Sequence, residues 1–259
     1  MNKTGLEDRW FVLNNTPAVF KEERSNKALF RYISFDILLQ MLNEKKIFLV
    51  KTSFWEDVYE NFVLKETLKY KGNIIPANHI RVLMQNRFFG QCWTRKMASD
   101  AIWRIYSPDK KSVRIKTGLG KLYDLGLAFP ENNSGICLLG KVDYYPQNKI
   151  EQDIQSLERV SQEELTQILL QSFFVKRDHF SHEAEYRLIY MSNKPKDENV
   201  ISMNVDPFDF IENIYFDPRA DDQYVKRCTR ILVDAFGYPK ERIFKSELYS
   251  FNPLEINVI

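Results

Sequence analysis

The sequence predicts an α+β protein, a single domain whose central sheet is mixed, mostly antiparallel and flanked by helices. Segments typical of strands alternate irregularly with segments typical of helices, without the regular strand–helix–strand repeat of a parallel sheet. The 259 residues are 44% hydrophobic and 28% charged, which is typical of a globular protein with a sizeable core. No internal repeat or low-complexity linker divides the chain, so we expect one domain over residues 1–259.

Apolar runs and capping residues mark the elements of the first half of the chain. A strand at 28–33 leads to Ser34, a preferred helix N-cap residue, and an apolar stripe then predicts a helix. Ser99 caps another predicted helix in the same way. The predicted strands lie at 28–33, 47–50, 88–94, 112–117 and 136–145, and the predicted helices at 35–46, 61–71, 77–86, 100–106 and 120–129.

The second half begins with two predicted helices, and Ser161 and Glu164 form a capping box at the start of the second. Gly237 stands where a helix C-cap glycine belongs, with Pro239 shortly after it. We expect a strand–helix–strand unit within 208–248 to pack on the preceding part of the chain. The predicted helices lie at 150–160, 161–174 and 223–237, and the predicted strands at 183–191, 199–205, 210–216 and 242–248.

Charge and cysteine content exclude several classes of protein. With 37 basic and 35 acidic residues the net charge is +2, so no global field favours nucleic acid or membrane. Cys92, Cys137 and Cys228 are widely spaced and odd in number, which favours free thiols in a reducing compartment. No apolar run approaches the ~20 residues that span a bilayer, and the first residues lack a signal-peptide layout. We therefore expect a cytoplasmic protein without membrane contact.

Common nucleotide-binding and hydrolase motifs are missing. The sequence holds no P-loop and no G-x-S-x-G elbow, and Gly118 and Gly120 lack the third glycine of a dinucleotide-binding fingerprint. His179 and His182 stand three residues apart beside two glutamates, but no distant third histidine completes a metal site. We expect no metal at this pair.

The segment SHEAEYRLIY, residues 181–190, carries charges at every second position of a predicted strand. Because side chains alternate across a strand, Glu183, Glu185 and Arg187 are expected to share one face. This pattern is typical either of a solvated face with an ion pair or of the wall of an active site. We expect Arg187 to pair with an acidic side chain and to fix its rotamer.

Three further stretches carry side chains suited to a binding site. Arg31 stands within a predicted strand, as either a buried ion-pair partner or a clamp for an anion. The segment FWEDVYENF, residues 54–62, gathers aromatic and acidic side chains on a loop, either for packing or for a ligand. Trp93 ends a strand, and Trp103 shares a helix face with Tyr106, where core packing is the expected role of Trp103.

The order of these motifs resembles that of a widespread bacterial family described only as a domain of unknown function. The resemblance covers about residues 28–220 and rests on LFRYIS, SFWEDVYE, CWT, SDAIWRIYS and HEAEYRLIY, followed by ENIYFDP. One departure is YSPDKKSVRI, where many members have a glycine-containing turn. Members occur near phage-defence genes, so the resemblance implies a toxin-type effector that acts with a partner defence protein or as a homo-oligomer.

The layout also resembles that of ADP-ribosyltransferases, which transfer ADP-ribose from NAD to an acceptor. This resemblance implies NAD as a substrate, Glu185 as the catalytic residue and Glu183 as the contact to the acceptor, a protein or a nucleic acid. It implies no metal ligand. The NAD-binding residues that it implies are Arg31, Tyr32, Thr52, Ser53, Phe54, Trp93 and Arg187.

Paired carboxylates suit this chemistry on physical grounds. Cleavage of the nicotinamide–ribose bond passes through an oxocarbenium-like transition state, which a nearby carboxylate stabilises. Positions two apart on a strand are separated by roughly 7 Å, so one carboxylate reaches the sugar and the other the acceptor. Mutual repulsion would raise the pKa of one of them, as a general base requires. Two alternatives are a metal-dependent nuclease-type effector that uses Glu60, Glu183 and Glu185, and a ligand- or protein-binding module without catalysis.

Overall fold

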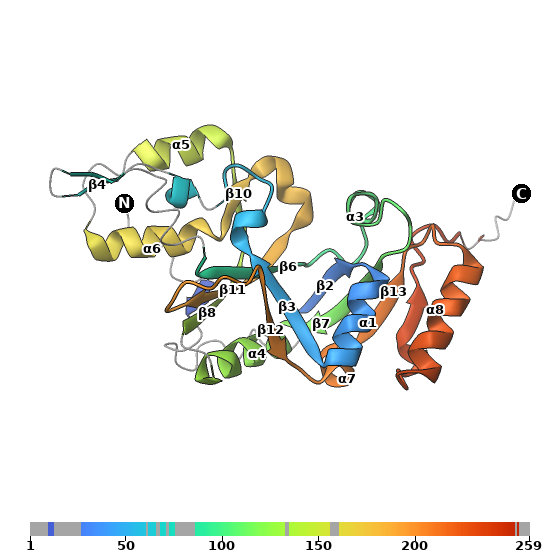
Figure 1. Cartoon of the computed structure of the whole chain (residues 1–259). Helices are drawn as coiled ribbons and strands as arrows, with labels where there is room; N and C mark the ends of the chain where they lie inside the picture. The colour runs from blue at the N-terminus through green and yellow to red at the C-terminus, as the bar shows by residue number, and fades with distance from the viewer. Residues whose placement is uncertain are drawn as a thin grey trace, which may run out of the picture.

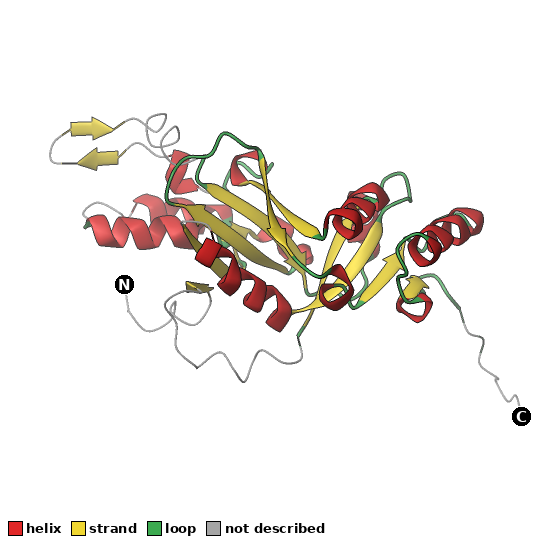
Figure 2. Cartoon of the chain, turned by 60° about the horizontal axis from the view of Figure 1, so that its bottom comes forward, coloured by secondary structure: helices red, strands yellow, loops and turns green. Residues whose placement is uncertain are grey.

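The computed structural model describes residues 10–12, 27–60, 62–65, 68–70, 73–75, 86–132, 135–155, 161–251 and 253. These residues form a mixed sheet with helices on both of its faces (Figure 1, Figure 2), which confirms the predicted α+β class. Within these ranges no helix is both long and apolar enough to cross a bilayer.

Ten of the described strands form the main sheet, and their pairings are antiparallel except for β13 with β14. The strands are β1 (Trp10–Val12), β2 (Ala28–Ile33), β3 (Lys46–Lys51), β6 (Phe88–Thr94), β7 (Val113–Gly118), β8 (Gly135–Lys141), β11 (Glu185–Ser192), β12 (Val200–Asn204), β13 (Asn213–Phe216) and β14 (Ile243–Lys245). The main path runs β1-β8-β11-β6-β2-β7-β13-β14. Two small sheets pair β9 (Asp143–Tyr145) with β10 (Val175–Arg177) and β4 (Leu68–Tyr70) with β5 (Asn73–Ile75).

The main sheet forks at β6. One edge of β6 pairs with β11 along its whole length. The other edge pairs with β2 only at Phe30↔Thr94, and near its opposite end it pairs with β3 at Val50↔Gly90. The β2 arm (β2, β7, β13 and β14) and the β3 arm (β3 and β12) therefore leave β6 at different ends. The candidate site lies in the wedge between these two arms.

Helices cover both faces of this forked sheet (Figure 2). The described α-helices are α1 (Phe35–Glu44), α3 (Asp100–Tyr106), α4 (Leu119–Asn132), α5 (Gln147–Gln155), α6 (Gln162–Ser172), α7 (Pro207–Phe210) and α8 (Asp222–Asp234). Short 3-10 turns lie at η2 (Thr52–Phe54), η3 (Phe62–Lys65), η4 (Asp178–Glu183) and η5 (Lys240–Arg242). A large apolar cluster packs α1, α4 and α8 against the sheet, and a smaller one packs α6 against β8 and β11.

The predicted helix ends are confirmed because capping depends only on neighbouring residues. The Ser34 hydroxyl accepts a hydrogen bond from the Ile37 amide, and the Ser99 hydroxyl accepts one from the Ile102 amide. Ser161 and Glu164 form the expected capping box. Gly237 has φ of 67° after α8, the left-handed conformation that glycine adopts without strain.

Several predicted elements need correction. The predicted helix over 61–71 is wrong, because residues 62–65 form one 3-10 turn and 68–70 pair with 73–75 in a hairpin. The predicted helix at 77–86 lies mostly outside the described residues. The strand over 136–145 breaks into β8 and β9, since β9 leaves the main sheet to pair with β10. The strand predicted at 183–191 begins at Glu185, so Glu183 is not part of it.

Candidate active site

A cavity of about 800 Å³ fills the wedge between the two arms of the sheet. Its walls come from β2, β3, β6 and β11, from the loop 54–60, from α3, and from β10 with η4. Arg31 on β2, Trp93 on β6 and Glu185 on β11 stand on strands of the same sheet, and all three line this cavity. The volume lies within the range of roughly 300–1,000 Å³ that is usual for small-molecule sites.

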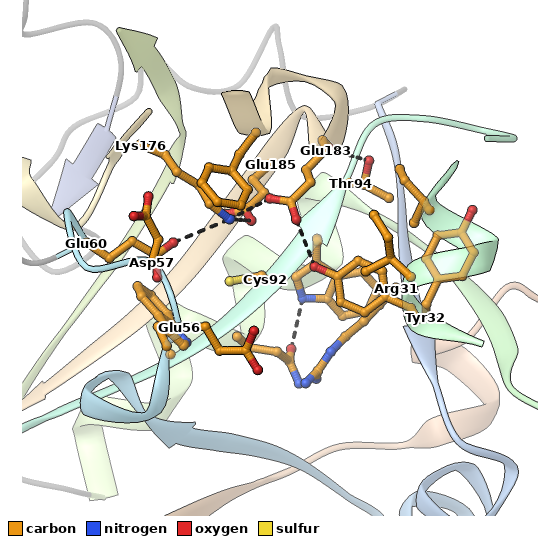
Figure 3. A pocket seen from close by; sticks show the side chains of 18 of the residues that line it. Arg31, Tyr32, Glu56, Asp57, Glu60, Cys92, Thr94, Lys176, Glu183 and Glu185 are labelled. Carbon is orange, nitrogen blue, oxygen red and sulfur yellow. Dashed lines mark hydrogen bonds and ion pairs between the residues drawn. The ribbon is translucent and has the colours of Figure 1, made fainter. Parts of the chain in front are cut away.

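One wall holds three carboxylates around a single ammonium group. The Nζ atom of Lys176 lies 2.5 Å from Glu183 Oε2, 3.1 Å from Glu185 Oε1 and 3.4 Å from Glu60 Oε1. Figure 3 shows these side chains converging from β10, η4, β11 and the loop 54–60. All four side chains are at most 9% exposed, so the charges interact with little screening by water.

Arg187 lies behind this wall and is fully buried. Its guanidinium donates to Glu185 at 2.6 Å, to Glu60 at 2.5 Å and to the Phe173 carbonyl at 2.7 Å. The expected pairing with an acidic side chain is therefore confirmed. Arg187 is not among the side chains that line the cavity. It orients Glu185 from behind, so the structure does not bring it to a position where it contacts a ligand.

Glu183 reaches the cluster from the turn before the strand. Ala184 has φ of 46° and ψ of 53°, a left-handed conformation that separates Glu183 on η4 from Glu185 on β11. The Thr94 hydroxyl donates to the Glu183 carbonyl and the Arg95 amide donates to the Ala184 carbonyl, which fix this turn to β6. The two carboxylates do lie close together, as expected. The reason is this turn and not the alternation of side chains along one strand.

Tyrosine hydroxyls contact both glutamates, the carboxylate of Glu183 and the backbone of Glu185. The Tyr106 hydroxyl, on α3, donates to Glu183 Oε1 at 3.0 Å. The Glu185 amide donates to the Tyr144 hydroxyl at 2.8 Å. Burial raises the pKa of both tyrosines, with the neighbouring carboxylates adding to the effect, so the hydroxyls stay protonated.

The pKa values of the two glutamates move in opposite directions. Burial and the adjacent Glu185 carboxylate raise the pKa of Glu183 to about 7, against the opposing effect of Lys176. Burial alone would raise the pKa of Glu185, but Arg187 and Lys176 outweigh it and hold the pKa well below its usual range. At neutral pH Glu185 is therefore a carboxylate, and Glu183 exchanges a proton readily.

Arg31 enters the cavity from β2, on the side away from Lys176 and Glu60 in the view of Figure 3. It is half-buried, and no described carboxylate pairs with it. Burial lowers its pKa to about 10, so the guanidinium remains charged at neutral pH. A charged arginine in a cavity, with no carboxylate partner among the described residues, is suited to bind an anion.

The other predicted NAD-binding residues are divided between the cavity and its surroundings. Trp93 lines the cavity, and its indole donates to Gln91 Oε1 at 2.9 Å. Tyr32 also lines it, with its ring edge-on to that of Trp103, which is buried in the core as expected. Phe54 lies at the rim and is 57% exposed. Thr52 is buried and Ser53 is exposed, and neither lines the cavity.

The loop 54–60 is fastened at several points. Arg177 donates to Asp57 Oδ1 at 3.0 Å, and the Tyr59 hydroxyl donates to Glu151 at 2.6 Å. The Trp55 ring lies against the Arg187 guanidinium, 4.4 Å from ring centre to Cζ. Packing explains most of the aromatic side chains in this loop, while Phe54 stays exposed at the cavity rim.

Lys176, Tyr106 and Tyr144 were not predicted as site residues. Lys176 stands in a three-residue strand, and no local pattern shows that it meets residues 60, 183 and 185. Cys92 also lines the cavity, but burial, with a contribution from Glu185, raises its pKa far above neutrality, so its thiol is not an activated nucleophile.

Comparisons with known proteins give little further information. No family model matches the chain, and no curated protein matches it. Among solved structures it is similar to Thermus sp. 2.9 DarT in complex with NAD+, with ADP-ribosylated ssDNA and with carba-NAD+. Each of the three matches has a TM-score of 0.38 and covers 85% of this chain. In the same order, the matches cover 96%, 94% and 96% of the DarT chain, with sequence identities of 9%, 9% and 10%. Such low TM-scores and identities support no conclusion about this chain.

Proposed function

We propose that the chain is an NAD-consuming enzyme of the ADP-ribosyltransferase type. The observation that carries this proposal is a pair of adjacent carboxylates with opposite pKa shifts in one cavity. The same cavity holds Arg31, with which no carboxylate of the described residues pairs. Two carboxylates with divergent pKa values suit a stabiliser of positive charge and a general base in one reaction. The acceptor, protein or nucleic acid, and the role as a defence effector remain predictions from the resemblance.

Glu185 stabilises the transition state in this reaction. The carbon–nitrogen bond between ribose and nicotinamide breaks, nicotinamide leaves with the bonding electrons, and positive charge develops on the ribose ring. Glu185 is kept ionised by Arg187 and Lys176 and is fixed in one orientation, so its charge needs no rearrangement as the reaction proceeds.

Glu183 acts on the acceptor. The acceptor attacks the anomeric carbon, forms the new bond to ribose and gives up a proton, which Glu183 takes. A pKa near 7 makes the carboxyl group an efficient base at neutral pH. Arg31 binds the pyrophosphate on the other side of the cavity, where its guanidinium offers several donors to phosphate oxygens.

A metal-dependent nuclease is less well supported. That alternative places a divalent ion between Glu60, Glu183 and Glu185, but the Lys176 ammonium already lies between these carboxylates. A second cation at this position would be repelled. With Lys176 in place, no group of three or more His, Cys, Asp or Glu side chains within the described residues is positioned to hold a metal ion.

The test is to incubate the purified chain with NAD and to measure nicotinamide release by chromatography. Labelled NAD with protein and single-stranded nucleic acid acceptors in parallel detects transfer. We expect release by the parent chain and loss of release in Glu185→Gln, with Glu212→Gln, a glutamate paired with Lys116 outside the cavity, as matched control. A folded chain that neither binds nor consumes NAD would contradict the proposal and favour a binding module.

A further inference from the structure

Lys176 pairs with all three buried glutamates of the cavity wall, and no other cation of the described residues is recorded with all three. Arg187 contacts Glu60 and Glu185, whereas Lys176 also holds Glu183 at 2.5 Å. The Phe180 ring lies 4.5 Å from the ammonium nitrogen and adds a favourable cation–π contact. The side chain is 9% exposed, so both its position and its charge are set by these neighbours.

The ammonium group compensates a cluster that would otherwise repel itself. Buried carboxylates within contact of one common atom are unfavourable unless a cation lies between them. Burial alone would lower the pKa of Lys176, but Glu185, Glu60 and Glu183 outweigh it and raise the pKa above its usual value. Lys176 is therefore permanently charged, as a bound metal ion would be.

We propose that Lys176 is a positioning residue for the transfer reaction and acts as the resident cation of the site, holding Glu183 and Glu185 at the separation that the reaction needs. This inference rests on the proposed function of the same cavity. Lys176 acts through the two carboxylates, since its contacts are directed to them. Its ammonium also fills the space in which oxygen ligands from the same three side chains would otherwise bind a divalent cation.

A direct consequence is that removing the amine creates a cation site. In Lys176→Ala the oxygens of Glu60, Glu183 and Glu185 face a space left by the ammonium and three methylene groups. A divalent ion such as Mn²⁺, or a small alkylammonium with N–H donors, restores the missing charge there. Tetramethylammonium supplies the charge without donors, so it separates hydrogen bonding from charge alone.

The experiment compares the parent chain with Lys176→Ala and with Lys51→Ala as matched control. Lys51 is also buried, at 6% exposed, and donates to the Asp197 carbonyl away from the cavity. The melting temperature of each chain is measured in the presence of Mn²⁺, propylammonium or tetramethylammonium. Mn²⁺ binding is measured as the loss of the spin-resonance signal of the free ion. We expect only Lys176→Ala to bind Mn²⁺ and to be stabilised by propylammonium, with no stabilisation by tetramethylammonium.

Kinetics test the positioning role separately. For Lys176→Ala we expect kcat to fall about 10²-fold with KM for NAD nearly unchanged, because small misplacements of reacting groups have costs of this size. Propylammonium should raise the kcat of Lys176→Ala about tenfold, because its ammonium group can take the position of the lysine amine. Tetramethylammonium should leave kcat unchanged, because it has no N–H donors. If Lys176→Ala does not fold, Lys176→Met fills the space and is tested for the same kcat loss at unchanged KM.

The outcomes separate the inference from the proposed function. A Lys176→Ala chain that binds no Mn²⁺, or that keeps the parent kcat, overturns the inference. If the parent chain itself consumes no NAD, the proposed function and the positioning role both fail. The Mn²⁺ and melting measurements then still decide whether Lys176 is the resident cation, since neither needs catalysis.

Discussion

At the residue scale, Arg187 is a fully buried charge whose partners are Glu60 and Glu185. We predict that Arg187→Ala lowers the free energy of unfolding by about 3–5 kcal/mol, because the two buried carboxylates lose a counter-ion. Activity should fall as well, since Arg187 orients Glu185. Urea unfolding measures the stability change.

A matched surface pair provides the control for this substitution. Arg104 lies 2.8 Å from Asp100 on α3, but its side chain is 62% exposed. Arg104→Ala should lower the free energy of unfolding far less than Arg187→Ala, because water screens an exposed ion pair. An Arg187→Ala chain as stable as Arg104→Ala would show that the buried pair contributes nothing to folding.

Glu185 and Glu183 should give different kinetic phenotypes. Glu185→Gln keeps the shape of the side chain but loses its charge, so we predict a fall in turnover of about 10²–10³ with KM for NAD nearly unchanged. Glu183→Gln should impair transfer to the acceptor while slow hydrolysis of NAD continues, because water needs less orientation than a specific acceptor. Nicotinamide release and acceptor labelling, measured on the same samples, distinguish the two. Equal loss of both signals in both variants would contradict separate roles.

The raised pKa of Glu183 predicts how stability depends on pH. The folded chain keeps a proton on Glu183 up to about pH 7, whereas the unfolded chain loses it near the usual value of 4.5. The folded state therefore binds more protons in this window, and its stability falls as pH rises from about 4.5 to about 7.

Glu183→Gln removes this titration. As pH rises through this window, the parent chain should lose stability and Glu183→Gln should not, so the variant gains stability relative to the parent. Urea unfolding at several pH values measures this change. Lys176, Glu185 and Tyr106 face the same carboxyl group and stay in place in both chains. His182→Gln, a substitution at the cavity that leaves the Glu183 carboxyl group in place, is the matched control. Parallel pH curves for parent and Glu183→Gln would contradict the raised pKa.

At the scale of elements, Gly90 allows the loop 54–60 to lie against β6. A Cβ atom at Gly90 would stand 2.6 Å from the Trp55 ring and 2.9 Å from Ile189. We predict that Gly90→Ala lowers the free energy of unfolding by about 1–3 kcal/mol, because overpacking forces Trp55 away from Arg187. The displaced loop should also weaken NAD binding, measured by calorimetry.

Gly118 on β7 is the matched control, because the nearest atom to its added Cβ is a Glu212 carboxylate oxygen at 3.4 Å. Gly118→Ala should leave stability within about 0.5 kcal/mol of the parent, as is usual for substitutions that meet no strain. Equal effects of the two substitutions would show that Trp55 does not rest on β6.

The elements of this fold differ in how far the sequence alone could predict them. Ser34, Ser99 and Ser161 cap helices through contacts within one turn, so their prediction is confirmed. The prediction of a helix over 61–71 was wrong because a short run with apolar residues fits both helical and strand spacing. Residues 68–70 form a strand because they pair with 73–75. The place of Lys176 depends on β10 lying next to β11 and η4, which no local pattern contains.

The same distinction explains which site residues were found. Arg31, Trp93 and Glu185 stand on strands whose order in the sheet brings them together, and their residue types marked them in advance. Thr52 and Ser53 follow β3 directly, yet the turn η2 directs them away from the cavity, leaving only Phe54 at its rim. The direction of a side chain in a single turn depends on backbone angles that residue types do not specify.

At the scale of the whole molecule, the cavity lies between two arms of the sheet that pair with different ends of β6. Arg31 belongs to the β2 arm, and Trp55 and Glu60 follow directly from the β3 arm. A ligand that contacts both sides therefore adds a further link between the two arms. Binding should accordingly be detected as stabilisation of the whole fold.

We predict that a non-hydrolysable NAD analogue at 100 times its Kd stabilises the folded chain by about 2.7 kcal/mol, which raises the melting temperature by roughly 5–10 °C. Arg31→Ala should lose most of this shift at the same analogue concentration, because the phosphates lose their charged donor. Arg230→Ala, an exposed arginine on α8 outside the cavity, should keep it. Differential scanning calorimetry of the three chains, with and without the analogue, provides the comparison. Equal shifts in all three would place the pyrophosphate away from Arg31 and leave its charge in the cavity without a ligand.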